Sequence, residues 1–331
     1  MKVCVFGAGA VGGHIAVRMA RAGNEVTVVA RGATATVLKE RGLTLKSGGE
    51  ELSARPRVVT DAAEAGPQDV VFVAVKSMSI PAATESIGRL RGDGTAFVFI
   101  VNGIPWWFPH GAKTTKPLPD LDYLDPGKRL AKGVGMERVL GSVVYSGNET
   151  VEPGVIVNHS GGNNVISVGD PGSAGSGRVQ AVSQLLEAAG FKSPVAPDVR
   201  RAVWTKLLTS NLASFPICTL LGAPLAVFGK NPELAKLGQA ILDEGIAVAN
   251  AYGIQPEVDP AKVYDPARMN SPHKPSMVQD YAKGRPLEID GVLVAVQKFA
   301  GAAGVPMPRF DALMAILVQR AMDAGLYTPA H

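Results

Sequence analysis

The chain has little of what marks several classes of protein. Its 331 residues include two cysteines, Cys4 and Cys218, which are too few and too far apart for a disulfide framework or a cysteine metal site. The net charge of +4 is small, and no basic run suggests nucleic acid as a partner. No apolar run reaches the roughly 20 residues that span a bilayer, and an apolar strand begins at once, which leaves no room for a signal peptide. These absences favour a cytoplasmic protein with no membrane association and no metal, long enough for two domains.

The first residues contain the strongest local pattern. An apolar stretch at residues 2–6 runs into a glycine-rich turn, and a helical stretch follows it. The turn reads Gly7-Ala8-Gly9-Ala10-Val11-Gly12. In a dinucleotide-binding turn, Gly7 permits the sharp bend, Gly9 lets a pyrophosphate approach the backbone, and Gly12 lets the helix pack on the strand. The alternative is a purely structural glycine-rich turn, which is less compatible with the strand before it and the helix after it.

An arginine follows the second expected strand, residues 24–30. In dinucleotide-binding folds the residue at this place contacts the adenosine ribose. A carboxylate binds the 2′-hydroxyl of NAD, whereas an arginine pairs with the 2′-phosphate of NADP. Arg31 therefore favours NADP(H) as the cofactor. The alternative is a solvated arginine in a surface loop.

Two polar residues follow further strands. Residues 69–75 and 96–101 are continuous apolar runs, typical of strands that are covered on both faces. Lys76 follows the first run and Asn102 follows the second, at the sheet edge where open α/β folds bind ligands. Asn102 could hydrogen-bond a carboxamide or hold a side chain in place. It is equally well explained by an Asn-Gly turn, so both interpretations stay open.

Residues 104–132 are expected to form a long loop, because they contain Trp106 and Trp107 but no clear periodicity. Long loops in compact domains are usually functional or disordered. The tryptophans could cover a cofactor or contribute to a subunit contact, but the favoured interpretation is that they hold the loop in place. A homodimer is one assembly that the sequence allows.

The composition changes near Pro197. Before it, apolar runs at residues 140–145, 155–158 and 165–168 alternate with Gly, Asn and Pro and predict strands. After it, helical patterns dominate, with long helices expected over 199–215, 232–252, 287–303 and 310–324. We therefore predict an α/β protein, with an N-terminal Rossmann-type dinucleotide-binding domain over residues 1–197 and a C-terminal all-α domain over residues 198–331.

Two charged residues of the helical part do not by themselves require a catalytic explanation. Lys206 lies among Trp204, Leu207 and Leu208, where its stem could simply extend to water. Glu288 lies in the first turn of an expected helix, where a carboxylate interacts favourably with the helix dipole.

Together these motifs resemble those of the ketopantoate reductases (2-dehydropantoate 2-reductases). The matching residues of the N-terminal part are the glycine turn, Arg31, Lys76 in Val-Ala-Val-Lys-Ser, and Asn102-Gly103. The more specific C-terminal share is Trp204-Thr205-Lys206-Leu207-Leu208, Ser276-Met277-Val278-Gln279-Asp280 and Leu287-Glu288-Ile289-Asp290-Gly291, with twelve positions from Ser276 to Glu288. The resemblance covers nearly the whole chain. It implies NADPH-dependent reduction of a small 2-oxo acid in a cleft between a Rossmann domain and a helical domain.

The resemblance also implies a role for each matching residue. Lys206 would donate the proton to the carbonyl oxygen, because hydride delivery to the keto carbon builds negative charge there. Asn102 would touch the nicotinamide end of the cofactor and the reaction centre, and Ser276 would donate to the substrate carboxylate. Glu288 would be a polar contact on the cofactor side or in the active site. Lys76, Arg31 at the 2′-phosphate, and the backbone of Gly147 would contact NADPH.

The chain departs from the family where substrate-binding asparagines are expected four and eight residues after the lysine. Those offsets hold Ser210 and Ser214. One inserted residue instead aligns Asn211 with the first asparagine and Phe215 with the second, and Leu225 stands at a further asparagine position. Asn211 is thus the expected substrate contact. Phe215 and Leu225 replace polar groups with apolar surface, so the pocket could prefer a bulkier or more hydrophobic 2-oxo acid.

Three functions are therefore distinguished. The favoured one is NADPH-dependent reduction of 2-dehydropantoate to pantoate. A D-2-hydroxyacid dehydrogenase acting on a bulkier 2-oxo acid is the alternative within enzymes. A non-catalytic NADPH-sensing protein is the alternative outside them, but a sensor would need the glycine turn and Arg31 without needing Lys206, Ser276 and Glu288.

Overall fold

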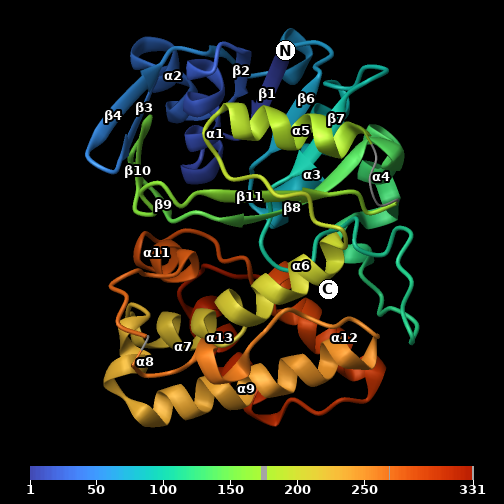
Figure 1. Ribbon diagram of the computed structural model, residues 1–331, viewed down its shortest axis with the longest axis vertical. Coiled ribbons are helices and arrows are strands. Elements are labelled where there is room, and N and C mark those ends of the chain that lie inside the picture. The colour runs from blue at the N-terminus through green and yellow to red at the C-terminus, as the bar shows by residue number, and fades with distance from the viewer. Residues whose placement is uncertain (173–176, 268, 330–331) are drawn as a thin grey trace. The chain divides into compact units, whose positions relative to one another are not determined.

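A computed structural model describes residues 1–172, 177–267 and 269–329 and divides the chain into two compact units (Figure 1). Unit 1 comprises Met1–Val101 and Asp125–Val199, and unit 2 comprises Asn102–Leu124 and Arg200–His331. The later change of unit lies close to the expected boundary after residue 197. The segment Asn102–Leu124 differs from expectation, because it belongs to the helical unit. No described helix is both long and apolar enough to cross a membrane.

Unit 1 is built on a seven-stranded sheet in the order β11-β8-β7-β6-β1-β2-β5. Its strands are β1 (Lys2–Phe6), β2 (Glu25–Val29), β5 (Arg57–Val59), β6 (Val70–Val73), β7 (Ala96–Phe99), β8 (Val139–Tyr145) and β11 (Val165–Gly169). Neighbours pair in parallel, except that β11 is antiparallel to β8. The order reverses between β1 and β6, and such a reversal is where Rossmann-type sheets bind ligands. The predicted Rossmann-type fold class is confirmed.

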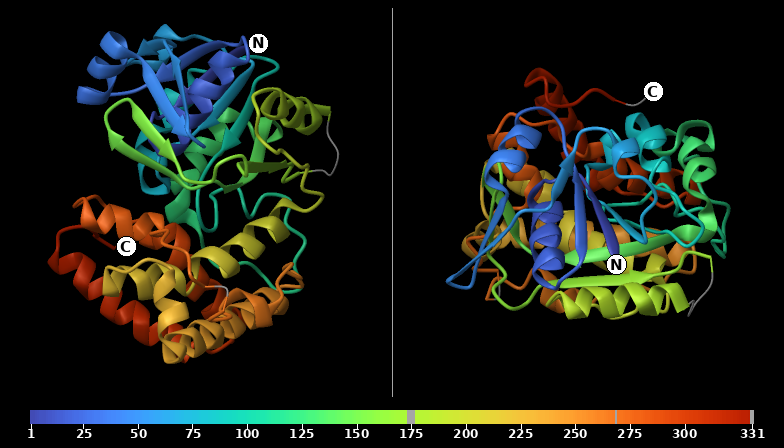
Figure 2. Two further views of the ribbon diagram at one scale, coloured as in Figure 1. Left: turned by 60° about the vertical axis from the view of Figure 1, so that its left-hand side comes forward. Right: turned by 90° about the horizontal axis from the view of Figure 1, so that it is seen from above.

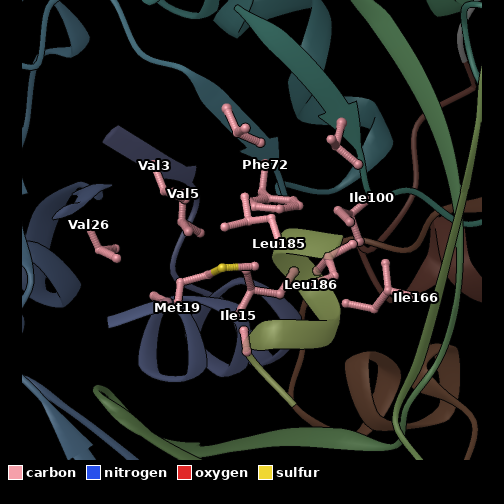
Figure 3. Packing of buried hydrophobic residues seen from close by; sticks show 14 of the residues in the cluster. Val3, Val5, Ile15, Met19, Val26, Phe72, Ile100, Ile166, Leu185 and Leu186 are labelled. Atoms are coloured by element: carbon pink, nitrogen blue, oxygen red, sulfur yellow. The ribbon is translucent and has the colours of Figure 1, made fainter. Parts of the chain in front are cut away.

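Helices cover both faces of this sheet (Figures 1 and 2). They are α1 (Ala10–Arg21), α2 (Gly32–Arg41), α3 (Ile80–Gly88), α4 (Arg129–Val134) and α5 (Gly177–Ala188), with 3₁₀ turns η1 (Ala62–Glu64), η2 (Ser77–Ser79), η4 (Pro126–Lys128) and η5 (Met136–Arg138). Met19 of α1, Leu186 of α5 and Phe72 of β6 belong to one buried cluster (Figure 3). Burying each of these side chains stabilises the unit by about 1.5–3 kcal/mol.

A second, four-stranded sheet lies beside α1 (Figure 2). It has the order β4-β3-β10-β9, with β3 (Leu43–Ser47), β4 (Glu50–Ala54), β9 (Asn148–Glu152) and β10 (Val155–Asn158). A Cβ at Gly13 would lie 2.6 Å from Ile156 Cδ1, so glycine at this position allows α1 to approach β10. The pattern of residues predicted β10 but not β3, β4 or β9.

Unit 2 is helical, as expected. It contains α6 (Val199–Lys206), α7 (Ser214–Leu221), α8 (Ala226–Lys230), α9 (Pro232–Ala251), α10 (Pro260–Val263), α11 (Ser276–Ala282), α12 (Ala295–Ala303), α13 (Pro308–Asp323), the π-helical turns η6 (Leu207–Asn211) and η7 (Asp290–Val294), and the 3₁₀ turn η3 (Asp122–Leu124). Two helices expected to be continuous, 199–215 and 287–303, are thus interrupted by π turns. Single π turns within helices occur frequently at functional sites.

The expected loop over residues 104–132 contains the turns η3 and η4 and the start of α4. Trp107 and Phe108 are buried in it. The Phe108 ring meets Phe299 edge-on at 5.5 Å between centroids, and Phe299 meets Trp204 in the same way at 5.4 Å. This packing supports the interpretation that the aromatic residues hold the segment against the helices of unit 2.

Candidate active site

The three glycines of the N-terminal turn have three different surroundings. Gly7 has a φ of +102°, and a Cβ there would lie 2.6 Å from Val75 Cγ1. A Cβ at Gly12 would lie 2.0 Å from the carbonyl oxygen of Gly7, so glycine at this position allows α1 to approach the turn after β1. At Gly9 a Cβ would meet none of the described atoms within 4 Å. The turn therefore leaves open space at the residue expected to face a pyrophosphate, which fits a dinucleotide at the first turn of α1.

Two cationic residues follow strands of the same sheet edge. Arg31 is exposed, has an extended backbone and directly precedes α2. Its charge contributes to lowering the pKa of Asp61, although the largest cause there is the hydrogen bond from the Ala63 N–H. Lys76 is half-buried and precedes η2 after β6. An exposed guanidinium after β2 is accessible to a ribose phosphate. The cofactor roles of Arg31 and Lys76 both stay predictions.

Gly147 has internal partners for its backbone polar groups. Its N–H donates to Ser160 Oγ at 2.7 Å, and its carbonyl accepts from the His159 N–H at 2.7 Å and from Asn158 Nδ2 at 3.3 Å. Both groups are therefore already engaged within the chain. A backbone contact between Gly147 and a cofactor stays a prediction that these hydrogen bonds do not favour.

Lys206 and Asn102 meet within unit 2. Lys206 is the last residue of α6, and its Nζ donates a hydrogen bond of 2.7 Å to Asn102 Oδ1. Burial lowers the pKa of Lys206 to about 8, and the negative charge of Glu288 partly offsets this effect. A half-buried ammonium with a pKa near neutrality can both stabilise a developing oxyanion and give up its proton. Three residues predicted to be catalytic are thus linked by one hydrogen bond and one electrostatic interaction.

Asn102 is held in place by the backbone of η7. The next residue, Gly103, has a φ of +76°, and a Cβ there would lie 2.2 Å from the Gly291 carbonyl oxygen. The Ile104 N–H donates to this same oxygen at 2.8 Å. The Asn-Gly turn and the hydrogen-bonding role of Asn102 were two open interpretations, and the structure combines them: the turn directs the amide toward Lys206.

The π turn η6 changes which residue shares a helix face with Lys206. In this turn the Leu212 N–H bonds to the Leu207 carbonyl, five residues back, at 2.9 Å. A helix that contains one extra residue brings Asn211, rather than Ser210, toward the side of the lysine. The gapped alignment stays a prediction that the π turn favours.

Asn211 is buried, and its Oδ1 has no hydrogen-bond partner among the described residues. A buried amide oxygen without a partner is costly unless a ligand supplies one. Ser214 differs, because its hydroxyl already donates to the Ser210 carbonyl at 2.6 Å. Asn211 is therefore the better candidate for a contact with a substrate hydroxyl.

The remaining predicted positions, Ser276, Phe215 and Leu225, lie on α11, on α7 and before α8. Ser276 is exposed and begins α11, where its hydroxyl is accessible. Phe215 is buried in α7, and Leu225 is half-buried with its N–H bonded to the His273 carbonyl at 3.0 Å. Tyr123 and Tyr327 belong to no motif of the sequence, yet both donate to Asp290, two residues after Glu288. No motif would have pointed to them, because their partner is distant in sequence.

Two family models and a curated relative match most of the chain. The family model described as Ketopantoate reductase PanE/ApbA matches residues 3–172, and that described as Ketopantoate reductase PanE/ApbA C terminal matches residues 198–321. The chain is 36% identical to the 2-dehydropantoate 2-reductase of Mesorhizobium japonicum over 329 residues, which cover 99% of this chain and 100% of that one.

Solved structures share the fold over the whole length. A protein of Ralstonia solanacearum, assigned as a ketopantoate reductase, superposes with a TM-score of 0.88 and 33% identity, covering 98% of this chain and 99% of that one. A D-mandelate dehydrogenase with NADH and anilino(oxo)acetate has a TM-score of 0.82 at 22% identity, covering 99% and 100%. The dimeric ketopantoate reductase of Staphylococcus aureus has a TM-score of 0.72 at 18% identity, covering 98% and 100%.

Proposed function

Since the chain belongs to the ketopantoate reductase family, we propose that it reduces 2-dehydropantoate (ketopantoate) to pantoate with NADPH. The observation that carries the proposal is the Lys206 ammonium, hydrogen-bonded to Asn102 and with its pKa lowered to about 8. An oxidoreductase acting on a CH–OH group needs a proton donor of this kind on the carbonyl oxygen.

The residues of unit 1 would hold the cofactor. Gly7, Ala8, Gly9, Ala10, Val11 and Gly12 would bind the pyrophosphate, and Arg31 would pair with the 2′-phosphate that distinguishes NADPH from NADH. Lys76 and Gly147 complete the proposed cofactor contacts. When bound, NADPH supplies the hydride that is added to the keto carbon.

The residues of unit 2 would hold the substrate and supply the proton. As the keto carbon is reduced, the Lys206 ammonium neutralises the charge on the carbonyl oxygen and gives it a proton. Asn102 Oδ1 orients that ammonium, and the carboxylate of Glu288 keeps the charged form populated. Ser276 would donate to the substrate carboxylate, and Asn211 Oδ1 would accept from the substrate hydroxyl.

A second candidate is supported by the apolar residues at two asparagine positions. With Phe215 and Leu225 in place of polar groups, a site offers fewer partners to a substrate hydroxyl and more surface to an apolar side chain. The D-mandelate dehydrogenase that shares the fold would be consistent with a D-2-hydroxyacid dehydrogenase acting on a bulkier 2-oxo acid. A non-catalytic NADPH sensor is least supported, because it would not need a proton donor.

The test is oxidation of NADPH and of NADH with a panel of 2-oxo acids: ketopantoate, branched aliphatic acids and phenylglyoxylate. We expect the highest kcat/KM with NADPH and ketopantoate. The variant Phe215→Asn should improve ketopantoate relative to phenylglyoxylate. A wild type that prefers phenylglyoxylate would establish the second candidate, and tight NADPH binding without turnover of any acid would establish the sensor.

The proposed assembly is a homodimer. It is supported by the dimeric state of the staphylococcal ketopantoate reductase that shares the fold. Sedimentation equilibrium of the full chain, with and without NADPH, would test it.

A further inference from the structure

A tyrosine near the C-terminus is hydrogen-bonded to the segment that contains Glu288. Tyr327 Oη donates to Asp290 Oδ1 at 2.5 Å, across 37 positions of sequence. The N–H of Leu287 donates to the carbonyl of Leu326 at 2.9 Å. The residues on both sides of Glu288 are therefore fixed to the same short stretch of chain.

A second tyrosine binds the same aspartate. Tyr123 Oη donates to the Asp290 carbonyl oxygen at 3.3 Å, and the Lys298 ammonium lies 5.0 Å from the Tyr123 ring centroid. Burial, followed by interaction with Asp290, raises the pKa of Tyr123 and Tyr327 above the usual value. Both hydroxyls therefore remain protonated and able to donate at any physiological pH.

Asp290 is the residue at which the π turn η7 begins. Its carbonyl oxygen, which Tyr123 binds, also accepts the N–H of Ala295, five residues on. A π turn is a rare interruption of an α-helix, so other contacts are expected to hold it. The two tyrosines are contacts of this kind, one at the side chain of Asp290 and one at its backbone.

The residue after Asp290 contacts the chain beside Asn102. The carbonyl of Gly291, next to Asp290, accepts the N–H of Ile104, and Gly103 lies against it too closely for a side chain. Asn102, the neighbour of Gly103, accepts the hydrogen bond from Lys206. A continuous series of contacts therefore joins the tyrosines to the proposed proton donor.

We propose that Tyr327 and Asp290 are a positioning pair, which fixes the π turn η7 and thereby keeps Asn102 in hydrogen-bonding distance of Lys206. The inference rests on the proposed function only for its effect on turnover. The proposal gives neither side chain a contact with substrate or cofactor. Its action is on the placement of Asn102 and on the acidity of the Lys206 ammonium that Asn102 binds.

The first test is hydrogen–deuterium exchange of Tyr327→Phe, which removes one hydroxyl. We expect several-fold faster exchange of the backbone amides of residues 290–295 and of Ile104. The matched control is Tyr281→Phe, because Tyr281 is also half-buried and its hydroxyl accepts from Arg320 Nε at 3.1 Å in the same unit. Unchanged exchange at residues 290–295 and Ile104 in Tyr327→Phe would overturn the inference.

The second test measures the acidity of Lys206 directly, by competitive acetylation at a series of pH values followed by peptide mass spectrometry. A less well placed Asn102 stabilises the ammonium less, so Tyr327→Phe should lower the pKa of Lys206 by up to about one unit. Tyr281→Phe should leave it unchanged. A loss of thermal stability alone would not move this pKa. An unaltered Lys206 pKa in Tyr327→Phe would refute the positioning role.

The pair itself is tested by substituting its acceptor. Asp290→Asn keeps an oxygen that can accept from Tyr327, so the Lys206 pKa should stay close to the wild-type value. Asp290→Leu should lower the Lys206 pKa as much as Tyr327→Phe does. The double variant Tyr327→Phe with Asp290→Leu should lower the Lys206 pKa no further than either single variant, because both substitutions remove the same interaction. Additive effects would show that the two residues act separately and would overturn the pairing.

The effect on turnover is measured last. In Tyr327→Phe we expect kcat to fall about fivefold to tenfold at pH 8.5 and less at pH 6.5, with the KM for NADPH within about twofold of wild type. A wild type that reduced none of the 2-oxo acids would overturn the proposed function. The exchange and acetylation measurements would still decide the positioning pair, because neither needs a substrate.

Discussion

Lys206 and Asn102 share a hydrogen bond of 2.7 Å although 104 positions of sequence separate them. An amide oxygen is a neutral acceptor, so it orients the ammonium without holding its proton as a carboxylate would. Glu288 adds a negative charge that acts on Lys206 from the same unit. Asn102 thus orients the Lys206 ammonium, and Glu288 favours its charged form.

The first prediction concerns the pH dependence of turnover. Because the pKa of Lys206 is lowered to about 8, the ammonium predominates below that pH and is lost above it. The kcat for reduction of a 2-oxo acid should therefore fall as the pH rises through about 8, and the kcat for oxidation of the 2-hydroxy acid should rise over the same range. Glu288→Gln removes the charge that raises this pKa, so the fall in the reduction kcat and the rise in the oxidation kcat should both occur at lower pH. Profiles of kcat between pH 6 and 10 would check this. A kcat that changes at the same pH in Glu288→Gln as in the wild type would contradict it.

The second prediction is that Lys206→Met inactivates the protein and stabilises it. Loss of a general acid should lower kcat by about 10²–10⁴-fold. The folded-state pKa of about 8 lies below the value of 10.5 for a free lysine, so the folded state binds the proton more weakly than the unfolded state does. The lysine therefore destabilises the fold below about pH 8, and this effect fades as the pH approaches 10.5. Thermal denaturation should show a Tm gain of about 2–4 °C at pH 7, smaller at pH 10. A lower Tm at pH 7 would count against the argument.

The third prediction separates two glycines of the same turn. Gly9→Ala should fold normally, because Gly9 has a φ of −72° and its Cβ would meet no described atom within 4 Å. The new methyl group would instead occupy the space needed by the pyrophosphate. Gly12→Ala should both unfold more easily and lose the cofactor, since its Cβ would lie 2.0 Å from the Gly7 oxygen. Fluorescence titration with NADPH and thermal denaturation of the two variants would check this. Equal Tm losses would show that Gly9 is merely structural.

The fourth prediction addresses the choice between NADPH and NADH. Arg31→Ala should raise the Kd for NADPH by about 10–100-fold, the value of a hydrogen bond to a charged group, and should change the Kd for NADH about twofold at most. Arg41→Ala is the control, because Arg41 is an exposed arginine at the last position of α2, the helix that Arg31 precedes. Isothermal titration with both dinucleotides is the measurement. Equal weakening of the two would remove the 2′-phosphate role.

Much of unit 1 could be predicted because its signals are local. A buried strand, the glycine turn and α1 are consecutive in sequence, and the order of apolar runs predicts a parallel sheet. The strand β4 was missed because Glu50–Ala54 is short, has no buried residue and contains only two apolar positions, Leu52 and Ala54. The placement of Asn102–Leu124 with the helical unit was also missed, because its contacts are with Phe299, Tyr252 and Ala303, far along the chain.

The members of the candidate site were proposed from the sequence, but their arrangement could not be. Lys206, Asn102 and Glu288 were identified by motif, yet the hydrogen bond between the first two depends on the turn at Gly103. The π turns could not be predicted, because a hydrophobic period of 3.6 residues differs too little from one that contains a single extra residue. Tyr327 could not be predicted either, since nothing near it in sequence indicates its partner.

The last prediction concerns the packing that maintains the π turn after Lys206. Gly245 of α9 is buried against η6, and a Cβ there would lie 2.5 Å from Leu208 Cδ2 and 2.4 Å from Leu212 Cδ2. Gly245→Ala would push on both ends of the turn that contains Asn211. We expect a loss of about 1–3 kcal/mol in the free energy of unfolding, together with a lower kcat and a higher KM for the 2-oxo acid. Gly301→Ala is the matched control, because Gly301 is exposed in α12 and its Cβ would meet no described atom within 4 Å. That variant should gain about 1 kcal/mol and keep wild-type kinetics. Urea denaturation and steady-state kinetics of the two variants would distinguish a glycine that shapes the site from one that only occupies a helix.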